Sequence, residues 1–167
     1  MESDKTPQQI GKGMWLAAWL ILMGILFVYF EDLIQEKYDP NHALSSDDSG
    51  EVILKRNRQG HYVAPGLING KPVVFLLDTG ATTISVPKKV ADNIGLIGGY
   101  KQQVGTANGM IEVFQTRLDS VSLGGITLND IQGHINPHMD SNTVLLGMSF
   151  MRNLEIIQKG NTLTLRR

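Results

Sequence analysis

One apolar segment with a single carboxylate inside it constrains how this 167-residue chain can fold. Residues 73–77 (VVFLL) and 82–86 (TTISV) flank the short link Asp78-Thr79-Gly80-Ala81. Short apolar runs that are rich in β-branched and aromatic residues predict buried β-strands. An ionised carboxylate is costly to bury unless it is paired or accepts hydrogen bonds, so Asp78 needs backbone donors or a special role. The segment predicts two strands joined by a tight turn, which Gly80 permits.

Two explanations fit the Asp-Thr-Gly triplet. Asp and Gly are ordinary turn residues, so Asp78 could simply cap a turn between strands. The flanking pattern is more specific, with two aliphatic residues before the triplet, a small residue after it and an apolar strand that ends at Pro87. This pattern resembles the active-site loop of aspartic proteases, in particular the retropepsin-like, single-lobe family. The resemblance implies that Asp78 is catalytic and that Thr79, Gly80 and Ala81 complete the active-site loop.

A second segment resembles the flap of the same family. Residues 103–114 (QVGTANGMIEVF) predict two alternating strands joined by a small tip, Thr106-Ala107-Asn108-Gly109. An Asn-Gly pair alone indicates an ordinary surface hairpin. Some thirty residues after the aspartate, it resembles the glycine-rich hairpin that closes over bound peptide in retropepsins, although this tip has less glycine than many. A flap must open and close while its backbone offers hydrogen bonds to a substrate strand.

A third segment completes the resemblance. Residues 144–151 (VLLGMSFM) read as an apolar strand, one glycine and a short amphipathic helix, which alone could be core. In aspartic proteases a hydrophobic-hydrophobic-glycine strand packs beside the catalytic loop and is followed by a short helix. The order of loop, flap and strand therefore implies an all-β, retropepsin-like barrel lobe with a short helix over residues 51–167.

The remaining pattern of this region agrees with an all-β domain. Strands are predicted at 51–55, 61–68 and 71–77, with Asn69-Gly70 as a hairpin turn, and one or two helical turns at 88–94. Gly124-Gly125 and Gly160-Asn161 predict further hairpin turns.

The amino-terminal part predicts a membrane anchor. Residues 14–30 carry no charge and would span about 25 Å as a helix, at about 1.5 Å per residue. Trp15 and Tyr29 lie at its ends, where amphipathic rings prefer the membrane interface. A signal peptide is less favoured because the run is long and no small-residue cleavage site follows. A buried core helix is less favoured because the run is apolar all round.

Charges around this helix predict its orientation. Lys5 and Lys12 precede it, and acidic residues follow it, so residues 1–13 are expected in the cytoplasm and the rest outside, in the periplasm if the host is Gram-negative. Residues 31–50 are polar and predict a stalk. The triplet Asp48-Ser49-Gly50 in the stalk also matches Asp-Thr/Ser-Gly, but no apolar strand precedes it to hold it in a site.

Other chemistry is weakly indicated. The chain has no cysteine and a net charge of -1 without a strongly basic patch, so thiol chemistry is excluded and nucleic acid is not an expected partner. His134 and His138 with Asp140 could suggest a metal site, but Pro137 breaks the helix that would align the imidazoles, and a polar loop is favoured. No metal or cofactor is expected.

The resemblance implies a mechanism that one chain cannot complete. Two aspartates must face each other across a water, and only Asp78 is credible, so a homodimer is expected, with Thr79 hydrogen-bonding across it and the Gly80 amide orienting the carboxylate. Peptides with bulky apolar residues are the expected substrates, because the lobe is rich in Val, Ile and Leu. The alternatives are a catalytically silent module that binds peptides in the same groove and an envelope scaffold that merely dimerises.

Overall fold

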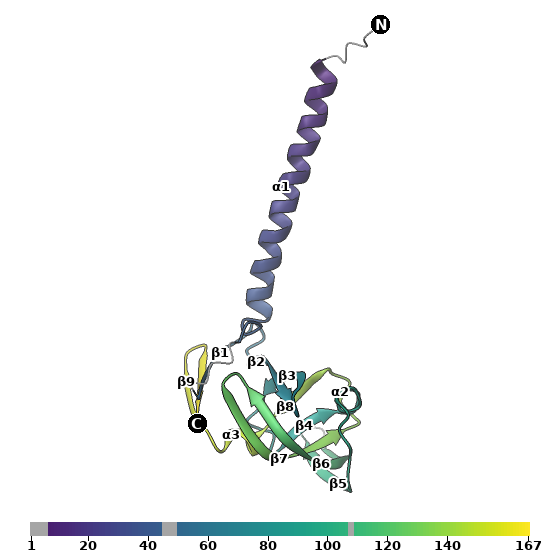
Figure 1. The fold of residues 1–167 in the computed structure, drawn as a ribbon, viewed down its shortest axis with the longest axis vertical. Coiled ribbons are helices and arrows are strands. Elements are labelled where there is room, and N and C mark those ends of the chain that lie inside the picture. Colours follow the sequence, from purple (N-terminus) through teal and green to yellow (C-terminus); the bar gives the residue numbers. More distant parts are fainter. Residues whose placement is uncertain (1–6, 45–49, 107–108) are drawn as a thin grey trace. The chain divides into compact units, whose positions relative to one another are not determined.

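The structure of the protein is a computed structural model that describes residues 7–44, 50–106 and 109–167. It divides into two units, Met1–Tyr38 and Asp39–Arg167 (Figure 1). The helices and strands follow in the order α1 Pro7–Tyr38, β1 Glu51–Lys55, β2 Val63–Ile68, β3 Lys71–Leu77, β4 Ile84–Pro87, α2 Lys88–Ile94, β5 Lys101–Thr106, β6 Gly109–Leu123, β7 Ile126–Asn136, β8 Thr143–Leu146, α3 Met148–Met151, β9 Glu155–Lys159 and β10 Thr162–Arg166.

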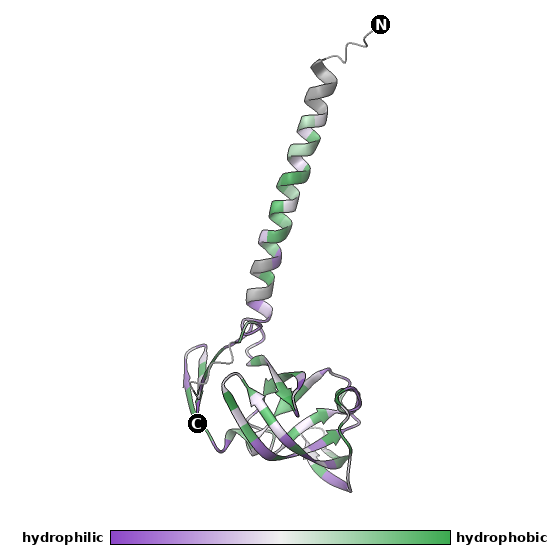
Figure 2. Ribbon diagram, viewed as in Figure 1, coloured by the Kyte–Doolittle hydropathy of each residue, from purple (hydrophilic) through white to green (hydrophobic). Residues whose placement is uncertain are grey.

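The first unit is the single helix α1. Its segment Gly13–Glu31 is 19 residues long, exposed and apolar enough to cross a membrane, a property that a signal sequence shares (Figure 2). The predicted helix at 14–30 lies inside α1, which continues to Tyr38. The extension follows from composition, since Leu, Gln, Glu and Lys after Phe30 favour a helix and the chain leaves it two residues before Pro40.

The second unit begins within the segment predicted as a stalk. Asn41 is only 5% exposed. Its side-chain amide donates to the carbonyl oxygens of Lys55, at 2.9 Å, and Val63, at 2.7 Å. Its Oδ1 accepts from the Lys55 amide at 2.7 Å. Asn41 thus fastens the segment before β1 to the ends of β1 and β2, so a soluble form of the domain is better begun at Asp39 than at Glu51.

Replacing Asn41 with alanine should destabilise the domain by about 2 kcal/mol, because the change leaves buried backbone groups of β1 and β2 without partners. Chemical denaturation of the domain measures the loss, and His42→Ala, at an exposed neighbour, is the control. Equal stability of the two variants would mean that water replaces the Asn41 side chain at no cost.

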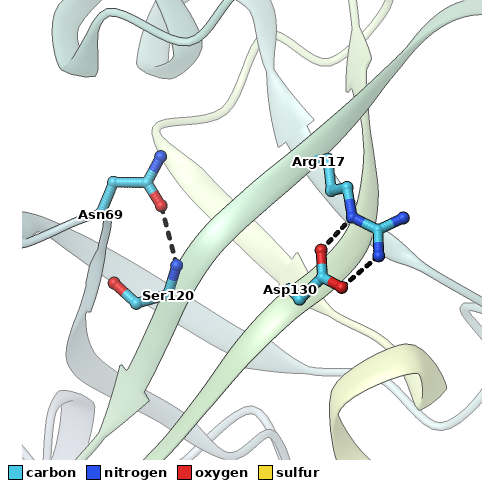
Figure 3. A network of polar contacts seen from close by, with 4 residues as sticks. All are labelled: Asn69, Arg117, Ser120 and Asp130. Atoms are coloured by element: carbon cyan, nitrogen blue, oxygen red, sulfur yellow. Dashed lines mark hydrogen bonds and ion pairs between the residues drawn. The ribbon is translucent and has the colours of Figure 1, made fainter.

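The hairpin from β2 to β3 delivers the aspartate loop. Asn69 and Gly70 both have positive φ, 50° and 73°, as the predicted Asn-Gly turn requires. The Asn69 side chain also accepts a hydrogen bond from the Ser120 amide at 3.0 Å, so the turn is attached to β6 (Figure 3). Strand β3 then runs through the core and ends at Leu77, immediately before Asp78.

A closed sheet forms the body of the domain. Its strands are ordered β2-β3-β8-β4-β7-β6-β5, and a further pairing of β2 with β6 closes six of them into a barrel (Figure 1). Strand β8 is parallel to β3, and β4 is parallel to β7. On the outside, Arg117 of β6 forms a bidentate ion pair with Asp130 of β7 (Figure 3). This topology confirms the predicted all-β barrel with short helices.

The hydrophobic core fills the barrel. Phe75 of β3 and Phe150 of α3 are fully buried, and burial of one such side chain stabilises a protein by about 1.5–3 kcal/mol. Helix α2, at the predicted bounds, begins after Pro87 and ends at Ile94. Its C-cap is Gly95, whose φ of 74° is the left-handed conformation that glycine favours. The core thus fixes the two strands on either side of Asp78.

A smaller sheet joins the two ends of the domain. Its order is β1-β10-β9, with both pairs antiparallel. The amide of Arg167 donates to the carbonyl of Gly50 at 3.1 Å.

Candidate active site

The Asp-Thr-Gly-Ala link forms a tight turn around the carboxylate of Asp78. The Asp78 amide donates to the carbonyl of Leu146 in β8 at 3.2 Å, and the Ala81 amide donates to the Asp78 carbonyl at 3.2 Å. The Gly80 amide donates to Asp78 Oδ1 at 2.9 Å. Asp78 is half-buried, whereas Thr79 and Gly80 are exposed. The backbone therefore holds the carboxylate in place without covering it.

The glycine after β8 allows a second segment to pack directly against this turn. A Cβ atom on Gly147 would lie 2.3 Å from the Thr83 carbonyl oxygen and 2.6 Å from that of Ala81. The next two amides, of Met148 and Ser149, donate to the carbonyls of Ala81 and Thr82 at 2.8 and 2.9 Å. The close approach expected from the hydrophobic-hydrophobic-glycine pattern is present, and only glycine fits it.

Ser149 adds a connection that the sequence did not suggest. Its hydroxyl donates to the carbonyl of Gln132 in β7 at 2.9 Å, and it accepts from the Ile84 amide at 3.2 Å. One buried side chain thus joins α3, β4 and β7 behind the Asp78 loop. A serine after an apolar strand gives no such signal in sequence, because its partners are 17 and 65 residues away.

A cavity of about 590 Å³ lies at the Asp78 carboxylate. The loop contributes Asp78 and residues 80–83, and the hairpin of β5 and β6 contributes residues 102, 104–106 and 111. Further lining residues come from β4, β7 and β8. The structure thus brings the predicted loop and the base of the predicted flap to one cavity, which we call the groove.

The flap residues are placed in part. Thr106 lines the groove, is paired with Gly109 across the hairpin and donates through Oγ1 to the Gly109 carbonyl at 2.8 Å. Gly109 has a φ of 114° and open space around it. Ala107 and Asn108, which were predicted with them, lie outside the described residues, as does Asp48 of the second triplet.

His134 is not in a polar loop, and that prediction is wrong. It lies in β7, is 8% exposed and lines the groove. Its Nδ1 forms a 2.9 Å hydrogen bond with Thr83 Oγ1. The polar residues before Pro137 suggested a loop. They alternate with core residues, however, and this alternation indicates a β-strand. Among the described residues, no three potential metal ligands gather at one place.

Burial lowers the pKa of the His134 imidazole below its ordinary value of about 6.5. The unfolded chain then binds a proton at a higher pH than the folded protein, so stability falls as the pH falls through this range. We expect the Tm of the wild type to exceed that of His134→Gln by less at pH 5 than at pH 8. Thermal unfolding at both values measures this, and a difference that is constant or grows on acidification would contradict it.

Comparisons with known proteins identify a matching family and similar sequences. Residues 64–153 match the family described as "gag-polyprotein putative aspartyl protease". The chain is 33% identical over 170 residues to an uncharacterized Sinorhizobium protein from the cobV 5′ region, a match covering 92% of the chain and 73% of the relative. It is 26% identical to an uncharacterized Rickettsia prowazekii protein, covering 84% of the chain and 64% of that relative.

A solved structure is also similar. It is a crystal structure of a retropepsin-like aspartic protease from Rickettsia conorii, with 32% identity and a TM-score of 0.61. The match covers 70% of this chain and 89% of the solved chain.

Proposed function

Because the chain belongs to the family described as "gag-polyprotein putative aspartyl protease" and is similar to a solved retropepsin-like aspartic protease, we propose that it is an aspartic endopeptidase. The observation that carries the proposal is the Asp78 carboxylate, which is held by the Gly80 amide and borders the groove. A fixed and accessible carboxylate is what general acid-base catalysis on a bound peptide requires.

The catalytic unit we propose is a homodimer. Of the residues lining the groove, Asp78 and His134 are the titratable ones, so a second carboxylate has to come from another copy. Two carboxylates at close range cannot both ionise comfortably, so the pair holds one proton. The ionised member acts as general base on a water, and the protonated member polarises the scissile carbonyl. Activity is therefore favoured at acidic to mildly acidic pH.

The loop residues have distinct parts in this proposal. Thr79, which is exposed, hydrogen-bonds to the other copy and keeps the two loops in register. Gly80 orients the carboxylate, and Ala81 connects the loop to α3 through its carbonyl. Thr106 and Gly109, with Ala107 and Asn108 between them, form the flap over the peptide.

We further propose that α1 is an uncleaved anchor, with residues 1–13 in the cytoplasm, 14–30 in the membrane and the catalytic domain outside. The uncharged segment and the lysines before it support this orientation. In this proposal residues 31–50 connect the membrane segment to the domain, and Asn41 within them is hydrogen-bonded to β1 and β2.

The direct test is peptide cleavage by the full chain in detergent micelles, with Asp78→Asn as the inactive reference. Cleavage should persist in the presence of a metal chelator, and specific activity should fall on dilution as dimers separate. Peptides that bind to the chain without being cleaved would instead favour the catalytically silent module. If peptides are neither bound nor cleaved, the result would favour the scaffold that merely dimerises.

The flap can be tested by strain at one glycine. Gly109→Val should lower kcat/KM by about tenfold or more, because valine is strained at a φ of 114° and the flap then closes poorly. Gly60→Val is the matched control, since Gly60 has a φ of 89°, open surroundings and no part in the groove. Both variants should lose similar stability, about 1–3 kcal/mol. Equal loss of activity in both would mean that the hairpin is only structural.

A further inference from the structure

Two adjacent strands present uncharged polar side chains to the groove. Ser85 lies in β4 and Thr83 immediately precedes this strand, whereas His134 and Asn136 lie in β7. All four residues line the groove. The strands are parallel, with Ser85 opposite His134 and Asn136 two residues further along β7. Alternate residues of a strand point to opposite faces, and the residue between the members of each pair is buried in the core. We call these four residues the polar strip.

The strip is buried although it borders a cavity. Ser85, His134 and Asn136 are 3%, 8% and 6% exposed. Polar groups at such depth cost free energy unless they form hydrogen bonds. A ligand that fills the groove and excludes water from it therefore has to form hydrogen bonds with the strip or leave its polar groups unpaired.

The hydrogen bonds already formed leave capacity for a ligand. Thr83 Oγ1 forms a hydrogen bond with His134 Nδ1 at 2.9 Å. Ser85 Oγ donates to the Met139 sulfur at 3.3 Å, and Asn136 Oδ1 accepts from the His138 amide at 2.9 Å. His134 Nε2 and the side-chain amide group of Asn136 are further polar groups of the strip. A hydroxyl can donate or accept, so Thr83 suits either imidazole tautomer, and Nε2 can serve as donor or acceptor.

The charge of the groove selects among polar ligands. No lysine or arginine is among its lining residues, and Asp78 is its acidic member. Burial lowers the pKa of His134, which favours the neutral ring over the imidazolium. A carboxylate would thus meet no cation there, and an aliphatic side chain would leave the strip unpaired. A carboxamide is uncharged and offers both a donor and an acceptor.

We propose that the polar strip is a specificity subsite for a substrate side chain that bears a carboxamide, asparagine or glutamine, with His134 as the contacting group and Thr83 as the residue that orients it. The inference rests on the proposed function, in that an extended peptide occupies the groove. With this subsite in the groove, the pockets expected for apolar substrate side chains are limited to the part lined by Val104, Ile111 and Leu145.

Peptide binding to the full chain carrying Asp78→Asn tests the subsite without cleavage. The probes are alanine octapeptides with a central Leu-Leu pair. At each of the other positions, one at a time, the alanine is replaced by asparagine in one peptide and by its isostere leucine in another. At one position asparagine should bind about fivefold more tightly than leucine, as a buried hydrogen bond allows. Adding His134→Leu or Thr83→Val should remove this preference. The preference is the ratio of two dissociation constants measured on the same protein, so a partly unfolded fraction affects both constants equally and does not change the ratio.

Gln115→Leu is the control, because Gln115 pairs with His134 across β6 and β7 but is exposed and does not line the groove. It should keep the preference. The subsite is overturned if no position favours asparagine, if no peptide binds, if the preference survives in both strip variants, or if the control loses it too. Failure of the wild type to hydrolyse peptides that do bind counts against the proposed protease and leaves this result standing.

Discussion

Replacement of Asp78 by asparagine should reduce peptide cleavage by at least about a thousandfold, because it removes the general base and the shared proton together. The fold should survive, since asparagine is isosteric with aspartate and its side-chain oxygen can keep the 2.9 Å hydrogen bond from the Gly80 amide. Initial rates and circular dichroism of the full chain measure the two properties. Asp119→Asn, at an exposed carboxylate on β6, is the control and should cleave at the wild-type rate.

A mixing experiment decides whether two copies share the chemistry. Co-expression of wild type and Asp78→Asn in equal amounts gives about one quarter wild-type dimers under random pairing in a two-fold assembly. Total activity should then be about one quarter of that of the same amount of wild type. Activity near one half, unchanged by dilution, would show that each chain works alone and holds a second catalytic group.

The second large effect is expected at Gly147, where alanine should destabilise the domain by about 3 kcal/mol. Its Cβ would lie 2.3 Å and 2.6 Å from two backbone oxygens, so the clash cannot be relieved by turning a side chain. Moving α3 away breaks the hydrogen bonds that Met148 and Ser149 donate to the Asp78 loop. Overpacking of this kind costs about 1–3 kcal/mol and occasionally more.

Denaturant midpoints of the domain from Asp39 measure this cost. Gly105→Ala is the matched control, because its Cβ would lie 3.7 Å from the Met110 sulfur, an ordinary contact. The control should change stability by less than about 1 kcal/mol. A similar small loss for Gly147→Ala would mean that the segment after β8 is free to move relative to the Asp78 loop.

Local patterns predicted the parts of the domain whose structure is set by neighbours in sequence. Helix α2 has the predicted bounds, and Asn69-Gly70 forms the predicted hairpin turn, with positive φ at both residues. The strand that leads to Asp78 was predictable because a short apolar run rich in β-branched and aromatic residues, ended by turn residues, favours a buried β-strand. Helix α1 contains the predicted membrane segment 14–30 and extends beyond it, since a helix tolerates charged residues.

The missed residues act through partners distant in sequence. His134 bonds to Thr83 across 51 residues, and the side chain of Asn41 bonds to Val63 across 22. Each is a polar residue in a polar stretch, and nothing local in such a stretch indicates a partner that is distant in sequence. The register of β4 against β7, which no local pattern specifies, is what brings Thr83 and His134 together.

The pairing of β1 with β10 determines when the domain can be completed during synthesis. Glu51 and Arg166 face each other and form an ion pair although 115 residues separate them. Because β10 is the middle strand, neither β1 nor β9 has its neighbour in this sheet until residues 162–166 leave the ribosome. Such distant pairings slow folding, since a long loop must close before any contact stabilises it. Loss of residues 162–167 should therefore release β1 as well as β9, because both pair with β10.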